Sequence, residues 1–102
     1  MIRHIVMWKM KAQAEGADAA ANMELMRRKL LALGPIIPEI VEADCGPDFN
    51  RSGVAYDFGL VTVLRTNADL QIYQDHPTHV KVKEFIAKVT ESRAVVDFAS
   101  VE

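Results

Sequence analysis

This chain of 102 residues contains only one cysteine and has no excess of basic over acidic residues. The single cysteine, Cys45, cannot close an intrachain disulfide, so the fold does not depend on one. Twelve Lys and Arg against fourteen Asp and Glu give a net charge of −2, so the sequence lacks the basic surface that binding to a nucleic-acid backbone requires. A glycine-rich phosphate-binding loop is also missing, which argues against a nucleotide site.

Long hydrophobic runs are missing as well. Apolar segments such as residues 5–8 and 60–64 are far shorter than the roughly 20 residues that a membrane-spanning helix needs. The first residues also lack the charged, apolar and small-residue pattern of a secretory signal. We therefore expect a soluble, cytoplasmic protein with no nucleic-acid or membrane partner. A single domain over residues 1–102 buries only about two-thirds of its unfolded surface, so a partner subunit would add stability.

The first half of the chain predicts two strands separated by a helix. Residues 2–10 are rich in apolar and β-branched side chains, which is typical of a strand. Pro38 opens a short second strand at residues 39–43, before a turn at residues 46–48. Between them, residues 18–33 carry apolar side chains at steps of three and four and end at Gly34. This predicts an amphipathic helix with an inner side formed by Met23, Met26, Leu30 and Leu33.

The second half predicts two more strands and two helices. Residues 54–65 read as the clearest strand, and residues 94–98 as the last one. Asn67 is a candidate cap for a short helix through Tyr73. A longer helix is predicted over residues 78–90, with an inner side formed by Val82, Phe85, Ile86 and Val89.

The resulting order, β-α-β-β-α-β, predicts a ferredoxin-like α+β fold with helices on one face of a four-stranded antiparallel sheet. The first strand is apolar on both alternating sides, with His4, Val6 and Trp8 on one side and Ile5 and Met7 on the other. A half-solvated sheet would alternate apolar with polar residues, so the second face needs a cover. A second copy of the chain is the simplest cover, and this predicts a homodimer built as a dimeric α/β barrel.

Two of the three histidines lie close together in residues 72–80. Pro77 biases His76 toward an extended backbone, which suggests that His76 anchors the turn. His79 shares a helical stripe with Val82 and Ile86, so its imidazole is predicted to face inward. Tyr73 precedes the proline by a short turn, and its hydroxyl can approach His79 across the break between the two helices.

These residues also carry a family resemblance. The segment Tyr73-Gln74-Asp75-His76-Pro77-Thr78-His79-Val80, together with residues 1–10 and the Ile36-Ile37-Pro38 entry to the second strand, resembles the stress-responsive dimeric A/B barrel (Dabb) domain family. Its best-understood activity is that of the plant olivetolic acid cyclase, which closes a polyketide ring by aldol condensation without a cofactor. The resemblance implies that His79 is a general base and Tyr73 an oxyanion donor, and it also matches His4 and His76 to histidines of that enzyme. The aromatics that line the alkyl pocket of that enzyme are replaced here by Met23, Met26, Leu30, Val89 and Thr90.

Each of these residues also has a purely structural interpretation. His79 can cap or fill the core through a bond to a backbone carbonyl, and Tyr73 can be a wall residue whose hydroxyl reaches water. His4 can be a buried histidine bonded across strands. A metal site at His76 and His79 is disfavoured because Pro77 keeps His76 off the helix and the glutamate of a zinc-binding helix is missing.

The sequence therefore favours a cofactor-free enzyme or enzyme-like pocket that acts on a small, hydrophobic, carbonyl-bearing molecule. The alternatives are a non-catalytic stress-responsive or ligand-binding dimer, and a relative of the cofactor-free monooxygenases. The catalytic candidates are His79 and Tyr73, and no metal is expected. The residues expected to line the ligand pocket are His4, Val6, Trp8, Met26, Leu30, Leu60 and Ile86.

Overall fold

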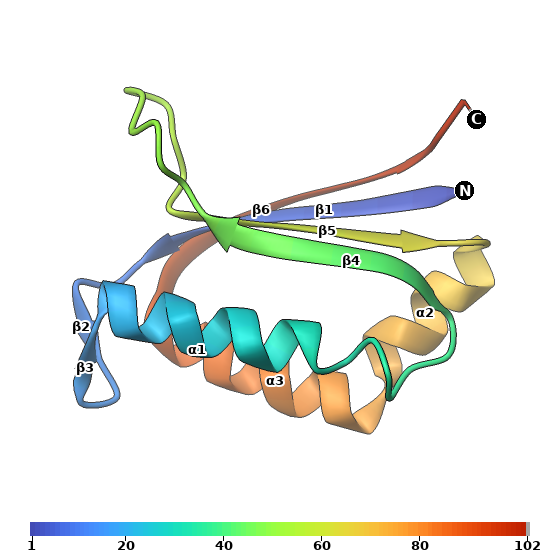
Figure 1. Ribbon diagram of the computed structural model, residues 1–102, viewed down its shortest axis with the longest axis horizontal. Helices are drawn as coiled ribbons and strands as arrows, with labels where there is room; N and C mark the ends of the chain where they lie inside the picture. The colour runs from blue at the N-terminus through green and yellow to red at the C-terminus, as the bar shows by residue number, and fades with distance from the viewer. Residues whose placement is uncertain (102) are drawn as a thin grey trace.

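The computed structural model describes residues 1–101 and has the predicted ferredoxin-like α+β architecture (Figure 1). Four strands form one antiparallel sheet in the order β4-β5-β1-β6, and β2 and β3 pair in a separate small hairpin next to the start of α1 (Figure 1). The elements are β1 (Ile2–Met10), β2 (Gln13–Ala14), β3 (Ala17–Asp18), α1 (Ala19–Leu31), β4 (Ile40–Pro47), β5 (Phe58–Leu64), α2 (Asn67–Asp75), α3 (Pro77–Val89) and β6 (Thr90–Ala99).

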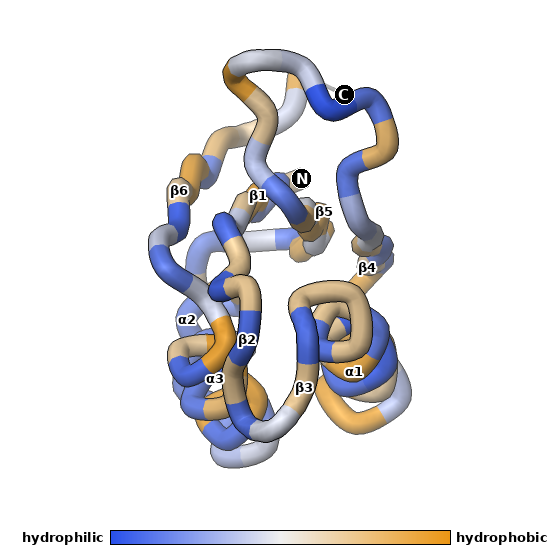
Figure 2. The backbone as a smooth tube through the Cα atoms, turned by 90° about the vertical axis from the view of Figure 1, so that its left-hand side faces the viewer, coloured by the Kyte–Doolittle hydropathy of each residue, from blue (hydrophilic) through white to orange (hydrophobic). Residues whose placement is uncertain are grey.

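The helices all lie on one side of the sheet, as Figures 1 and 2 show from two directions. β1 is central, pairing with β5 on one side and with β6 on the other. Because side chains alternate along a strand, every second residue of β1 points toward the helices. These are His4, Val6, Trp8 and Met10, all of them buried. The His4 side of β1 therefore faces the helical layer.

The helix boundaries follow from local capping. The Asp18 side chain accepts a hydrogen bond from the Ala21 amide at 2.9 Å and so caps α1. α2 is capped by Thr66, one residue before the predicted Asn67, because the Thr66 hydroxyl accepts from the Asp69 amide at 3.1 Å. α1 ends at Leu31, two residues short of the prediction, yet Leu33 stays buried in the following turn.

Three strand boundaries differ from the prediction by more than one residue. β4 extends to Pro47 because its ladder with β5 continues to the Pro47–Phe58 pair. Residues 54–57, predicted as strand, belong to a loop in which Val54 is 89% exposed. The loop is fastened by Arg51, which bonds the Asp57 carboxylate at 2.8 Å, while Asp57 accepts from the Met10 amide at 2.7 Å. β6 begins at Thr90, directly after α3, rather than at residue 94.

The face of the sheet that points away from the helices is apolar and exposed. Met7 is 40% exposed, Val61 38%, Val96 53% and Phe98 43%. Figure 2 shows the loop between β4 and β5 rising on this side of the sheet. An exposed apolar surface of this kind marks an interaction face.

Candidate functional site

His79 is positioned by the break between α2 and α3. Pro77 at the start of α3 supplies a helix-compatible φ angle, and it keeps the preceding His76 extended at ψ 129°. The His76 Nδ1 atom then accepts from the Thr78 amide at 3.2 Å, so His76 anchors the turn as expected. This places His79 in the first turn of α3 with only 4% of its surface exposed.

The end of α2 provides the partner of His79. The Tyr73 carbonyl lies in the last turn of α2, where its backbone partner is the His76 amide at a long distance of 3.4 Å. The Nδ1 atom of His79 lies 2.9 Å from this oxygen. Since a carbonyl oxygen only accepts hydrogen bonds, Nδ1 carries the proton and Nε2 keeps a free lone pair. The fold thus selects the tautomer in which Nε2 can act as a proton acceptor.

Burial keeps this imidazole neutral. The pKa of His79 is lowered to about 4, mainly by desolvation and to a smaller extent by the charge of Lys83, while the bond to the Tyr73 carbonyl acts in the opposite direction. At neutral pH the ring is therefore uncharged. Its availability as a base does not depend on small pH changes around 7.

The Tyr73 ring packs against the His79 ring. The two rings are stacked, with centroids 4.1 Å apart and an interplanar angle of 28°. Tyr73 is 1% exposed, and its hydroxyl lies 3.4 Å from the Thr62 hydroxyl. Burial raises the pKa of Tyr73, so the phenol stays protonated. The side chain does not line the cavity described below, and it lies instead beneath His79 and edge-on to His4.

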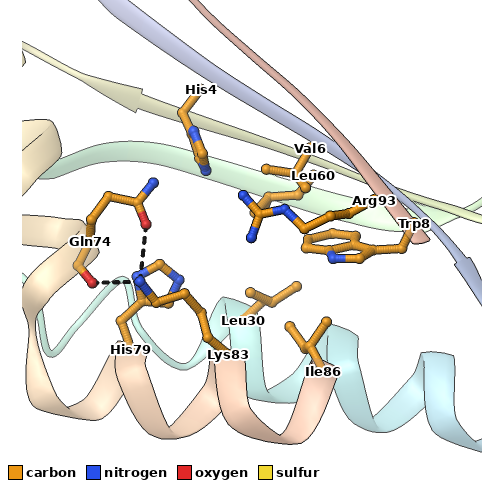
Figure 3. Close-up of a pocket in the computed structure, with 10 residues that line it drawn as sticks. All are labelled: His4, Val6, Trp8, Leu30, Leu60, Gln74, His79, Lys83, Ile86 and Arg93. Atoms are coloured by element: carbon orange, nitrogen blue, oxygen red, sulfur yellow. Dashed lines mark hydrogen bonds between the residues drawn. The ribbon is translucent and has the colours of Figure 1, made fainter. Parts of the chain in front are cut away.

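His4 enters the site from the sheet and is paired with Asp97. The two residues face each other on β1 and β6, and the His4 Nδ1 atom lies 2.6 Å from the Asp97 carboxylate. His4 is buried, whereas 41% of the Asp97 side chain is exposed. The carboxylate fixes the orientation of the ring, and Figure 3 shows that ring pointing from the sheet toward His79.

A cavity of about 60 Å³ lies between the sheet and α3 (Figure 3). Of the expected pocket residues, the cavity wall includes all except Met26, which is fully buried in the core, one turn before Leu30 on α1. Both His79 and His4 face the cavity, but Tyr73 does not. The complete wall consists of His4, Val6, Trp8, Leu30, Leu60, Gln74, His79, Lys83, Ile86 and Arg93.

Sequence reasoning did not identify Gln74, Lys83, Arg93 or Asp97. Lys83 follows His79 by four residues, so helical spacing alone could have placed it on the same face of α3. Arg93 lay outside the predicted last strand, and its orientation became evident only from the pairing with Trp8. Asp97 could be recognised only with the β1–β6 register, which the sequence does not reveal.

Residues 1–101 are the part of the chain that the structure describes. In that range no group of three His, Cys, Asp or Glu side chains is arranged to hold a metal ion. None of the described helices is long and apolar enough to cross a membrane.

Comparison with known proteins identifies relatives along nearly the whole chain. The family model described as "Stress responsive A/B Barrel Domain" matches residues 2–100. A dimeric ferredoxin-like protein of unknown function from Thermobifida fusca is 29% identical, with a TM-score of 0.83 over 97% of this chain and 90% of that one. A dimeric ferredoxin-like protein from Bacteroides fragilis is 26% identical, with a TM-score of 0.82 over 95% and 93%.

A third similar structure is a hydroxynitrile lyase from Passiflora edulis. It is 20% identical, with a TM-score of 0.79 over 95% of this chain and 90% of that one, and at this identity the likeness concerns the fold alone. A search of curated proteins finds no match to this sequence. With the family model matched over residues 2–100, the chain belongs to the stress responsive A/B barrel domain family.

Proposed function

We propose that this protein is a homodimer whose cavity binds a small, hydrophobic, carbonyl-bearing molecule, and that His79 is the general base of a cofactor-free, aldol-type cyclisation. The observation that carries the proposal is the state of His79. Its ring is buried and neutral, its Nδ1 proton is fixed on the Tyr73 carbonyl, and the ring faces a cavity whose wall is partly apolar. A neutral imidazole held in one tautomer is suited to accept a proton from carbon.

The proposed reaction is redox-neutral and needs only proton transfers. The Nε2 atom of His79 removes a proton from a carbon next to a carbonyl group, which leaves an enolate and an imidazolium. The enolate carbon attacks a second carbonyl carbon of the same molecule, so that a carbon–carbon bond forms and the attacked oxygen becomes an alkoxide. The imidazolium then returns its proton to the alkoxide. Apolar walls hold the chain folded, so that the two carbonyl groups meet.

This reaction is tested with linear 3,5,7-triketo thioesters of graded chain length, in which attack of C2 on the C7 ketone closes a six-membered ring. The expected result is cyclic product above the level formed in buffer, detected by chromatography and mass spectrometry, with an optimum at short chain lengths because the cavity is small. Equal product formation with and without the protein would contradict the catalytic proposal.

We propose Tyr73 as the donor that stabilises the developing oxyanion, and the geometry makes this role testable. The Tyr73 ring lies edge-on to His4, its hydroxyl lies 3.4 Å from the Thr62 hydroxyl, and the side chain does not line the cavity. Donation to a ligand therefore requires the ligand oxygen to reach the space between His4 and His79. If it does not, Tyr73 acts only by positioning His79 through its ring and carbonyl.

Tyr73→Phe separates these two roles, because it removes the hydroxyl and keeps the ring stack and the backbone carbonyl. A donor role predicts a turnover loss of about 100-fold or more. The free energy of unfolding should change by only about 1 kcal/mol, because the one hydroxyl partner, Thr62, is at a long distance of 3.4 Å. Turnover equal to that of the wild-type chain would assign Tyr73 to positioning alone.

The homodimer proposal is supported by the apolar outer face of the sheet and by the two relatives described as dimeric. Val96 lies on that face and is 53% exposed. Val96→Asp is expected to shift the chain from dimer to monomer in light scattering at micromolar concentration, because a charge would be buried without a partner.

Ile72→Asp is the matched control, since Ile72 is 48% exposed on α2, away from the outer face of the sheet. This control should remain a dimer. A wild-type chain of monomeric mass, or equal effects of the two substitutions, would contradict the proposed interface.

A non-catalytic dimer, either stress-responsive or ligand-binding, is the second candidate, and two observations favour it over a catalytic one. The cavity volume of about 60 Å³ is well below the roughly 300 Å³ of the smaller typical ligand sites. The Tyr73 hydroxyl also lies behind the cavity wall rather than in it. This alternative predicts ligand binding without turnover.

A further inference from the structure

Two cationic side chains line the cavity, and the proposed reaction gives neither of them a role. Lys83 comes from α3 and is half-buried, and Arg93 comes from β6 and is exposed. Figure 3 shows the Arg93 guanidinium extending over the cavity beside Trp8, toward the side where Gln74 and His79 lie. The two cations thus enter the same space from the two layers of the fold.

Lys83 is held in place without being neutralised. Its ammonium donates to the Gln74 carbonyl at 2.7 Å and to the Gln74 side-chain oxygen at 3.3 Å. Both acceptors are uncharged, and an ammonium has three N–H donors, so one donor and the full charge remain. The carbonyl belongs to the last turn of α2, where it has no partner within the helix. The fold therefore fixes the position of the charge at the cavity.

Arg93 makes no side-chain hydrogen bond or ion pair with any residue in the part of the chain that the structure describes. The carboxylate on the same side of β6 is that of Asp97, which His4 already engages at 2.6 Å. Asp97 also lies four residues farther along the strand, a separation of about 13 Å. The five N–H donors of Arg93 are thus available to a ligand.

Five residues of the wall are apolar. Trp8, Leu30 and Ile86 form the end of the cavity away from His79 in Figure 3, and Val6 and Leu60 lie above it on the sheet. A ligand that satisfies both parts of this wall has an apolar body and one compact anionic group. A carboxylate fits best, because its two oxygens match the planar fork of a guanidinium and its size suits a small cavity.

Resting on the ligand-binding function proposed above, we infer that the ligand carries a carboxylate, which Arg93 binds through its guanidinium and Lys83 through its remaining N–H. The apolar body of the ligand packs against Trp8, Leu30 and Ile86. This places the anionic group beside His79, where its charge compensates that of Lys83. The carboxylate therefore also makes the imidazole a stronger base, since the Lys83 charge is one of the causes that lower the His79 pKa.

The test compares hexanoate with hexanamide, which has the same shape and no charge. Binding is followed by NMR titration of the amide and imidazole signals of the wild-type protein. Hexanoate is expected to bind about tenfold or more tightly than hexanamide, as charge-assisted hydrogen bonds allow. Saturation with hexanoate is expected to raise the pKa of His79, whereas hexanamide should leave it unchanged.

Two substitutions test whether the cations of the cavity cause the preference for hexanoate. Arg93→Gln is expected to weaken hexanoate binding about tenfold while leaving hexanamide binding unchanged. Lys81→Gln is the control, because Lys81 is an exposed lysine of the same helix as Lys83 but does not line the cavity. It removes the same charge and is expected to leave the affinity for both probes unchanged.

The outcomes separate the carboxylate from the pocket itself. Equal affinity for the two probes would contradict the proposed carboxylate recognition, but it would be compatible with the proposed hydrophobic ligand site. Hexanoate binding that Arg93→Gln does not weaken would also contradict the carboxylate recognition, because another group would then hold the anion. The absence of any change in the cavity signals with either probe would overturn both the carboxylate and the ligand site.

Discussion

His79→Gln is expected to reduce turnover of a 3,5,7-triketo thioester by at least about 100-fold, and up to about 10,000-fold, because a glutamine cannot accept the proton from carbon. The amide group of glutamine can still donate to the Tyr73 carbonyl, which His79 contacts at 2.9 Å in the native chain. The packing around the site should therefore survive. Turnover is measured by product formation, and folding is checked by circular dichroism and by the mass in solution.

His76→Gln is the matched control for this experiment. His76 lies three residues before His79, anchors the turn through the Thr78 amide, and does not line the cavity. Losing this cap is expected to cost about 1 kcal/mol of stability and to leave turnover nearly unchanged. Normal turnover in His79→Gln, or equal losses in both variants, would remove His79 from the proposed mechanism.

Stability is expected to fall by about 3 kcal/mol between pH 6.5 and pH 4 because of His79 alone. Its pKa is about 4 in the folded chain, against the ordinary value of 6.5. Between these values the unfolded chain binds a proton and the folded chain does not, so the free energy of unfolding decreases as the pH falls. Above pH 6.5 the imidazole is neutral in both states, and the stabilisation is complete.

Urea unfolding of the wild-type chain and of His79→Gln, at several pH values from 7 to 4, isolates this contribution. Carboxylates such as Asp57, whose pKa is lowered mainly by the bond from the Met10 amide, titrate in both proteins and cancel in the difference. The gap between the two stabilities should change by about 3 kcal/mol over this range. Parallel pH profiles would show that His79 is protonated as readily in the folded as in the unfolded chain.

The fold could be predicted because alternation and helical periodicity report burial directly. β1 alternates around His4, Val6 and Trp8, and the inner stripe of α3 appears as His79, Val82 and Ile86. The ends of the strands were harder to predict, because they depend on pairing with neighbouring strands. β4 continues to Pro47 through its ladder with β5, and no local property of residues 44–47 indicates this.

The site could be predicted only in part. Helical phase and Pro77 were enough to turn His79 inward and to set His76 apart as the turn anchor. The partners of these groups come from distant elements. Asp97 reaches His4 through the β1–β6 register, and Arg93 reaches the cavity through its pairing with Trp8. The depth of Tyr73 behind His79 likewise depends on tertiary packing.

The most direct test of the account is a nitrogen NMR titration of the His79 ring. At pH 7 the His79 ring is expected to be neutral and to carry its proton on Nδ1, as the 2.9 Å contact with the Tyr73 carbonyl requires. A titration midpoint of about 4 is also expected. A midpoint near the ordinary value of 6.5, or a proton on Nε2 at pH 7, would contradict the claim that His79 is a buried base facing the cavity.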